Sequence, residues 1–214
     1  MNIPSIFYSW FPESKCIDTS LSDFYSFCIE NCNKDGLALD IGADMCEGLT
    51  TGLLENKWNN TVYCFDLWIR RKPENIDGTV FIEGDALLKV KDFLDQQGQT
   101  ISIIEVDLRG IEKTKYHPDD LNLDYELSKT GPVLDSCMKY VTNNSVIILS
   151  EFHNSKGLNE EAFSLARAFA KHNLNYECLC YGMGLKFGKS AWIIKDQQTN
   201  MHKDDLINMM SLLK

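Results

Sequence analysis

Apolar positions along the chain follow two different spacings. Short, nearly continuous apolar runs alternate with stretches in which apolar residues recur at helical spacing. The short runs predict strands over 37–41, 61–65, 79–82, 100–106, 145–149, 176–181 and 191–195. The helical spacing predicts helices over 20–32 (with Ser22 as the alternative start), 48–57, 86–97, 133–141, 160–172 and 204–213. Strands that alternate with helices are typical of a mostly parallel sheet with helices on both of its faces.

The last two predicted strands break this alternation, because only the turn-rich stretch 182–188 lies between them. A hairpin at this place adds one antiparallel strand in the edge region of the sheet. We therefore expect an α/β fold with a doubly wound, mostly parallel seven-stranded sheet and one antiparallel strand. We expect residues 1–35 to form an N-terminal extension and helix packed on the domain, which spans residues 36–214.

Composition and charge narrow the class of protein. With 214 residues, 44% of them hydrophobic, the chain can bury one sizeable core, and its net charge of -10 argues against nucleic-acid binding. No apolar stretch reaches the ~18 residues of a membrane span, and the first residues lack the basic and apolar regions of a signal peptide. A chain with its own core needs no disulfides, so we expect the eight cysteines to be thiols in a reducing cytoplasm.

Acidic residues close several of the predicted strands. They are Asp40, Asp66, Asp85, Glu105, Asp107 and Glu151. The carboxyl ends of parallel strands meet at one edge of a sheet, where α/β proteins bind their ligands. Each acid alone is also explained as a helix N-cap or a loop residue. Their recurrence at successive strand ends favours one shared ligand crevice.

The turn after the first strand separates two classes of ligand. It reads Gly42-x-Asp44-x-Cys46-x-Gly48, so an acid stands where a dinucleotide-binding G-x-G-x-x-G motif has its second glycine. Asp44 would repel a pyrophosphate, and the sequence has no phosphate-binding G-x-x-x-x-G-K-[ST] loop. An NAD-linked α/β protein is therefore disfavoured. Acids at this edge suit S-adenosylmethionine, which carries an ammonium group, a sulfonium centre and ribose hydroxyls.

Three of the acids match three parts of this cofactor. We assign its methionyl end to Asp40, its ribose to Asp66 and its adenine amino group to Asp85. The full set of predicted cofactor-binding residues is Asp40, Gly42, Ala43, Asp44, Asp66, Leu67, Asp85 and Ala86.

Two motifs carry a resemblance to a known family. They are Ile104-Glu105-Val106-Asp107-Leu108 and Leu149-Ser150-Glu151-Phe152, at the ends of the fourth and fifth predicted strands. They are similar to the Ile-Asp-x-Asp-Leu and Phe-Asp-Glu/Asp-Tyr elements of the macrocin O-methyltransferase-like group. That group belongs to the class I S-adenosylmethionine-dependent methyltransferases and methylates hydroxyls of sugars and other natural products. The wider resemblance covers residues 36–195, and the family's reversed last strand matches the predicted hairpin.

The resemblance implies roles for individual residues. Glu105 and Glu151 correspond to ligands of a Mg²⁺ ion, and Asp107 corresponds to a base that takes the proton of the acceptor hydroxyl. Mg²⁺ prefers carboxylate oxygens, which makes these roles chemically coherent. His153 is a second candidate base near the same edge. Ser150 stands where the group has a further metal-binding acid, so a metal-independent enzyme remains an alternative.

We therefore expect residues 36–214 to be an S-adenosylmethionine-dependent methyltransferase domain with a Rossmann-like fold. The expected reaction is cytoplasmic O-methylation of a hydroxylated small molecule, a sugar among the candidates, with S-adenosylmethionine and Mg²⁺ as cofactors. We expect no nucleic-acid or membrane partner, and a homodimer is compatible with this expectation. The loops 1–18 and 109–130 are the candidates for the acceptor pocket. The alternative from another class is a catalytically degenerate methyltransferase-fold module for binding or assembly.

Overall fold

A computed structural model describes residues 15–17, 19–43, 46, 48–67, 77–108, 130–150, 153–154, 157–158, 160–182 and 188–195. The helices are α1 (Leu21–Asn31), α2 (Leu49–Glu55), α3 (Ala86–Gln97), α4 (Thr130–Cys137) and α5 (Glu160–Lys171). The strands are β1 (Leu37–Ile41), β2 (Val62–Asp66), β3 (Thr79–Glu83), β4 (Ile101–Val106), β5 (Val141–Leu149), β6 (His153–Asn154), β7 (Gly157–Leu158), β8 (Asn175–Gly182) and β9 (Lys189–Lys195). The predicted helix 204–213 and most of the segments 1–18 and 109–130 lie outside the described residues.

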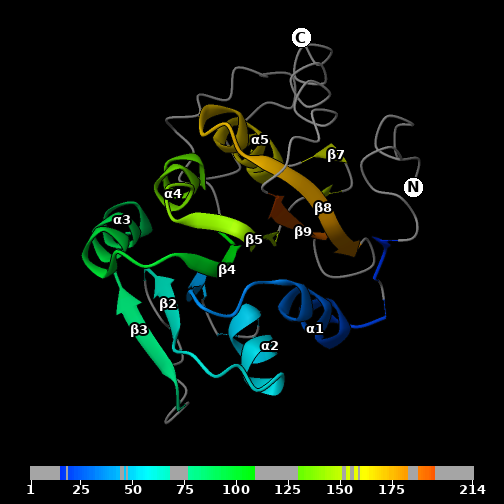
Figure 1. Cartoon of the computed structure of the whole chain (residues 1–214), viewed down its shortest axis with the longest axis horizontal. Coiled ribbons are helices and arrows are strands. Elements are labelled where there is room, and N and C mark those ends of the chain that lie inside the picture. Colours follow the sequence, from blue (N-terminus) through cyan, green and yellow to red (C-terminus); the bar gives the residue numbers. More distant parts are fainter. Residues whose placement is uncertain are drawn as a thin grey trace.

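The main sheet contains a single strand that runs against the others. Its seven strands lie in the order β3-β2-β1-β4-β5-β9-β8 (Figure 1). The pairs from β3 to β5 are parallel, whereas β9 pairs antiparallel with both β5 and β8. This topology confirms the predicted fold class, a doubly wound and mostly parallel seven-stranded sheet. The chain order reverses between β1 and β4, and ligands of α/β sheets bind beside such a switch point.

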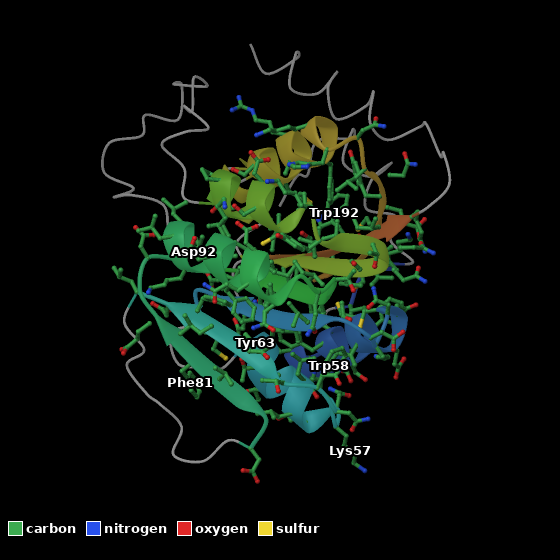
Figure 2. The ribbon with its side chains drawn as sticks, turned by 60° about the vertical axis from the view of Figure 1, so that its left-hand side comes forward. Lys57, Trp58, Tyr63, Phe81, Asp92 and Trp192 are labelled. Atoms are coloured by element: carbon green, nitrogen blue, oxygen red, sulfur yellow. The ribbon has the colours of Figure 1, made fainter. Side chains whose placement is uncertain are left out.

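Helices cover both faces of the sheet because side chains along each strand alternate between two cores. On β1, Leu39 packs in the core formed with α3, α4 and α5, whereas Ala38 packs in the core formed with α1 and α2. Figure 1 shows these two groups of helices on opposite sides of the sheet. In Figure 2, Trp58 lies beside α1 and α2, and Trp192 lies on the side of α4 and α5. Both faces of the central strands are therefore buried.

The ends of two helices follow from single residues. Ser20 caps α1 by accepting a hydrogen bond at Oγ from the Asp23 backbone N–H, with an N···O distance of 3.0 Å. Asp85 caps α3 in the same way, with its carboxylate 3.1 Å from the Leu87 nitrogen. Gly98 ends α3 in the left-handed conformation at φ 60°, which glycine adopts without a steric penalty. These local signals explain why both helices match their predicted ranges closely.

The boundary between α4 and β5 differs most from the prediction, and α4 begins at Thr130 rather than at residue 133. The helix predicted over 133–141 ends at Cys137, and β5 begins at Val141 rather than at the predicted residue 145. Val141 pairs with Ile101 of β4, and the register of the two strands shifts beyond this pair. Asn144 interrupts the apolar pattern of β5 and has a positive φ of 62°. Pairing with β4 therefore extends a strand whose polar first half looks like a loop in the sequence.

The N-terminal part of the chain packs on the sheet at two places. Cys16 forms an isolated bridge with Tyr181 of β8, and the Ile17 nitrogen lies 2.7 Å from the Tyr181 carbonyl oxygen. Phe24 and Tyr25 of α1 are buried in the core on the α1 and α2 side. The domain boundary at residue 36 stays a prediction. In the described part of the chain, no helix is both long and apolar enough to cross a membrane.

Candidate active site

Backbone hydrogen bonds hold the predicted turn and strand ends together at the carboxyl edge of the parallel strands. The Gly42 nitrogen lies 2.8 Å from the Phe65 oxygen, which joins the end of β1 to β2. The Asp107 nitrogen lies 2.8 Å from the Ile41 oxygen, which joins β4 to β1. The predicted site residues that follow these strand ends are Gly42, Ala43, Asp66, Leu67, Asp85, Ala86 and Asp107. The structure therefore places the described members of the predicted cofactor edge along neighbouring strands.

The turn after β1 requires glycine at position 42. Its φ is 85°, and a Cβ atom there would lie 2.0 Å from the backbone oxygen of Asp107. The end of β4 therefore packs directly on the turn, so the candidate base and the predicted cofactor turn are adjacent. Asp44 in the same turn lies outside the described residues, and its role stays a prediction.

The ends of β2 and β3 offer groups that suit a nucleoside. Asp66 is half-buried at the last position of β2, and the side chain of Leu67 after it is 67% exposed. A carboxylate at this place can accept hydrogen bonds from ribose hydroxyls, and an exposed apolar side chain next to it can cover a flat base. Asp85 gives one carboxylate oxygen to the first turn of α3, and Ala86 is buried beside it. The contacts of these residues with a cofactor stay predictions.

Asp40 is buried beneath α2 rather than open at the edge. Its Oδ2 atom accepts hydrogen bonds from the Thr50 nitrogen at 3.1 Å and from the Thr50 hydroxyl at 2.5 Å. Burial, and next the negative charge of Glu105, raise the pKa of Asp40 to about 7. The described contacts of Asp40 thus hold the first turn of α2. Its predicted contact with the methionyl end of the cofactor remains untested.

Glu105 lies at the centre of a buried polar network that joins five parts of the fold. Both of its oxygens lie 2.9 Å from the hydroxyl of Tyr25 on α1. Oε2 lies 2.7 Å from the backbone nitrogen of Leu49, at the start of α2. Oε1 lies 2.7 Å from the Lys189 ammonium on β9 and also accepts a hydrogen bond from the Ser150 hydroxyl after β5. The Glu105 side chain is almost fully enclosed, with 1% of the residue exposed.

The network keeps Glu105 and Lys189 charged. Burial opposes the charge on Glu105, but the Lys189 ammonium and the hydrogen bonds outweigh it and lower the pKa of the carboxyl. Burial likewise opposes the charge on Lys189, but the charges of Glu105, Asp107 and Asp40 outweigh it and raise the pKa of the ammonium. Asp107, the candidate base, is thus close enough to Lys189 to raise the pKa of its ammonium. The Glu105–Lys189 ion pair therefore lies next to the predicted catalytic edge.

The surroundings of Glu105 do not fit the Mg²⁺ ion that the resemblance implied. Mg²⁺ needs near-octahedral oxygen ligands at ~2.0–2.1 Å, whereas the lysine ammonium lies 2.7 Å from Oε1. Among the residues that the structure describes, no three His, Cys, Asp or Glu side chains are grouped to hold a metal ion. Glu151, the second predicted ligand, lies outside the described residues, and its role stays a prediction.

His153 and Asp107 remain the candidate bases. Asp107 directly follows β4 and is half-buried. His153 lies in the short strand β6, which pairs with β7 outside the main sheet. The structure does not describe where the His153 side chain points, so its predicted role is untested.

Sequence reasoning missed the partners that decide the charge of Glu105. Tyr25 falls within the predicted helix 20–32 and was given no role, and Lys189 belongs to a strand that was predicted to begin only at residue 191. Ser150 was the one available signal, because it stands at a position where an acid was expected. A hydroxyl there can donate to Glu105 and accept from Lys189 at once.

Comparisons with known proteins agree with this architecture. No model of a protein family matches the chain, and no curated protein matches it. Among solved structures, CalS11, a TDP-rhamnose 3′-O-methyltransferase of calicheamicin biosynthesis, aligns with a TM-score of 0.53 at 14% identity, over 83% of this chain and 77% of CalS11. MycE methyltransferase of the mycinamycin pathway, in complex with Mg, SAH and mycinamycin VI, has a TM-score of 0.52 at 10% identity, over 91% of this chain and 55% of MycE.

A third structure belongs to the same group of folds. An O-methyltransferase family protein from Burkholderia thailandensis has a TM-score of 0.52 at 12% identity, over 84% of this chain and 56% of that protein. At such identities the similarity is one of fold, and the macrocin-like subgroup stays a prediction. Together with the strand order, these alignments show that the chain has the Rossmann-like fold of the class I S-adenosylmethionine-dependent methyltransferases.

Proposed function

We propose that this protein is an S-adenosylmethionine-dependent O-methyltransferase that methylates a hydroxyl of a small molecule. The observation that carries the proposal is the position of Asp66, the last residue of β2, and Leu67 directly after it, beside the Gly42 turn at the switch point of the sheet. A carboxylate and an exposed leucine at this place suit the ribose and adenine of the cofactor. The net charge of -10 favours a small acceptor over a nucleic acid.

A sugar hydroxyl is the first acceptor class to test. CalS11 is named as acting on TDP-rhamnose, and the MycE structure contains mycinamycin VI. Both proteins share the fold of this chain. The proposed substrate class is hydroxylated natural products and nucleotide sugars.

The proposed roles follow the carboxyl edge. When bound, S-adenosylmethionine supplies a methyl group on a sulfonium centre. Asp66 accepts hydrogen bonds from the ribose hydroxyls, Leu67 covers the adenine, and Asp85 accepts from its amino group. Asp107 takes the proton from the acceptor hydroxyl while the new C–O bond forms and the C–S bond breaks. The proposed step uses no Mg²⁺, because the described surroundings of Glu105 do not fit one.

Calorimetry with S-adenosylhomocysteine tests the cofactor site directly. The full chain should bind this ligand, and Asp66→Ala should weaken binding by about 10- to 100-fold, the cost of losing charge-assisted hydrogen bonds. Asp92→Ala is the matched control, because Asp92 is an exposed acid on the opposite side of α3 from the buried Val90. No binding at millimolar ligand would refute the proposal.

A second measurement separates catalysis from binding. Release of S-adenosylhomocysteine is followed with a panel of nucleotide sugars and hydroxylated natural products. Asp107→Asn should lower methyl transfer by about 10²- to 10⁴-fold while it leaves cofactor affinity within a few fold. Cofactor binding without transfer to any member of the panel would favour the binding-module alternative instead.

A further inference from the structure

The charge pair in the interior of the site spans strands that are not neighbours. Glu105 belongs to β4 and Lys189 to β9, and β5 lies between these two strands in the sheet. The Lys189 side chain reaches across the end of β5, where its ammonium lies 2.6 Å from the Ser150 hydroxyl oxygen and 2.7 Å from Glu105 Oε1. Only 9% of the lysine side chain and 2% of the glutamate side chain are exposed.

We propose that the Lys189 ammonium is a resident cation that takes the place of a divalent metal beside Glu105, so that this position binds no Mg²⁺. The inference deepens the proposed function and rests on it for its catalytic meaning. Whether the Lys189 ammonium fills the cation position can be measured independently of methyl transfer.

The acceptor positions of the Glu105 carboxylate are filled. Its four donors are the Tyr25 hydroxyl, which lies at equal distance from both oxygens, the Leu49 nitrogen, the Ser150 hydroxyl and the Lys189 ammonium. A carboxylate has about four lone-pair positions. A metal ion could reach these oxygens only by displacing donors from α1, α2, β9 and the residue after β5.

The ammonium is also held on its other sides. Besides its two hydrogen bonds, Lys189 Nζ lies 5.7 Å from the centre of the Tyr25 ring, within the range of a cation–π contact. The charged groups that act on it are Glu105, Asp107 and Asp40. A fixed positive charge therefore already offsets the acids of this region, which is the electrostatic task of a metal ion in an acidic site.

A Mn²⁺ titration tests the filled site, with Mn²⁺ as a probe for a divalent ion. Electron paramagnetic resonance measures free Mn²⁺ in the presence of the full chain and of Glu105→Gln. We expect the two proteins to give the same binding curve up to about 1 mM Mn²⁺, because the Glu105 oxygens are occupied and any weak binding comes from carboxylates that both proteins share. A saturable Mn²⁺ site that is present in the unaltered chain and lost in Glu105→Gln would overturn the proposal.

A double-mutant cycle tests the ion pair itself. Lys189→Met should lower the melting temperature by roughly 10 °C, because it leaves a buried charge without its partner. The double variant Lys189→Met with Glu105→Gln should recover a large part of this loss, because it no longer contains the unpaired charge of Glu105. The matched control joins β9 to β8: Lys195 and Glu177 form a half-exposed pair at 3.5 Å. The corresponding changes there should shift the melting temperature by only a degree or so.

Equal, additive effects in the two cycles would overturn the proposal. If Lys189→Met does not fold, recovery of folding in the double variant with Glu105→Gln becomes the readout of the cycle, and the Mn²⁺ titration needs no variant of Lys189. Binding of S-adenosylhomocysteine is measured in the same samples with and without EDTA. A chain that binds no cofactor would refute the proposed function. Glu105-dependent metal binding, or equal effects in the two cycles, would refute the filled cation site.

Discussion

Asp40 and Glu105 are register partners on the adjacent parallel strands β1 and β4, and both side chains are buried. Their environments differ. Glu105 receives the Lys189 ammonium and keeps its charge, whereas Asp40 accepts hydrogen bonds from the nitrogen and hydroxyl of Thr50. Burial, and next the charge of Glu105, disfavour a charge on Asp40 and raise its pKa to about 7.

This difference predicts that Asp40 makes folding stability fall with rising pH. The folded pKa of about 7 lies above the ordinary 3.8, so between these values the folded state holds a proton that the unfolded state has lost. The contribution of Asp40 is full below about pH 4 and is lost as the pH rises through 7, at about 1.4 kcal/mol per pH unit. Asp40→Asn should abolish this part of the slope, because its amide oxygen still accepts from Thr50 but cannot ionise.

Urea unfolding of the chain and of Asp40→Asn at pH 5, 6, 7 and 8 measures the effect. The variant should gain relative stability with each step up to about pH 7 and then level off. Asp92→Asn on the exposed face of α3 is the control, and Figure 2 shows Asp92 at the α3 end of the molecule. A parallel pH dependence of Asp40→Asn and the unaltered chain would contradict the prediction.

Replacing Gly42 should damage the turn more than its backbone conformation alone requires. A left-handed conformation costs a non-glycine residue about 1–2 kcal/mol. Gly78→Ala isolates this cost, because Gly78 has φ 84° and nothing within 4 Å of a new Cβ atom. Gly42→Ala has nearly the same φ of 85° but meets the Asp107 oxygen at 2.0 Å. We expect it to cost about 3 kcal/mol or more and to weaken S-adenosylhomocysteine binding. Chemical unfolding and calorimetry measure both, and equal losses in the two variants would be the contrary result.

Removing the Tyr25 hydroxyl should destabilise the fold, because Glu105 loses a donor that it cannot replace with water. The expected cost of Tyr25→Phe is about 1.5–3 kcal/mol, the range for a hydrogen bond to a charged group. Tyr140→Phe is the control, because the Tyr140 hydroxyl bonds Asp95 at 2.6 Å in an exposed position. Its cost should stay within about 0.5 kcal/mol. Urea unfolding at pH 7 compares the two, and a smaller loss for Tyr25→Phe than for Tyr140→Phe would contradict this account.

The cysteines should be thiols that react only slowly in the folded protein. None of the eight forms a disulfide, and all except Cys16 are buried. Burial raises the pKa of Cys28, which keeps its reactive thiolate form rare. Titration of the folded protein with a disulfide reagent should show a fast phase of one thiol or less. After unfolding without reductant, the same titration should count eight thiols. Cys16→Ser should remove the fast phase. Cys28 and Cys180 have their sulfur atoms 3.7 Å apart, so a count of six thiols would reveal a bond between them.

Local patterns were enough to predict the elements that carry the site. β1 and α3 have the predicted bounds, because an apolar run between Gly36 and Gly42 and a cap pair at Asp85 and Gly98 mark their ends. The gathering of strand-end residues at one edge then follows from parallel pairing. The fold class could therefore be predicted from the order of the elements alone.

The environment of Glu105 could not be predicted in this way. Its partners Tyr25 and Lys189 are 80 and 84 residues away along the chain, and no local pattern links them to it. The sequence showed an acid at a strand end, for which a metal ion was one chemical explanation. The fold places the Lys189 ammonium there instead. Because β9 lies next to β5, Lys189, the first residue of β9, reaches across the end of β5 to Glu105.

The position of β9 also bears on how the chain folds during synthesis. Among the described strands of the main sheet, β8 pairs only with β9, although it is made before β9. The nascent chain therefore carries β8 without this neighbouring strand, and Glu105 without its counter-charge, until Lys189 and the rest of β9 have left the ribosome. Long-range pairings of this kind close late in folding. The last described strand thus completes both the sheet and the charge balance of its interior in one step.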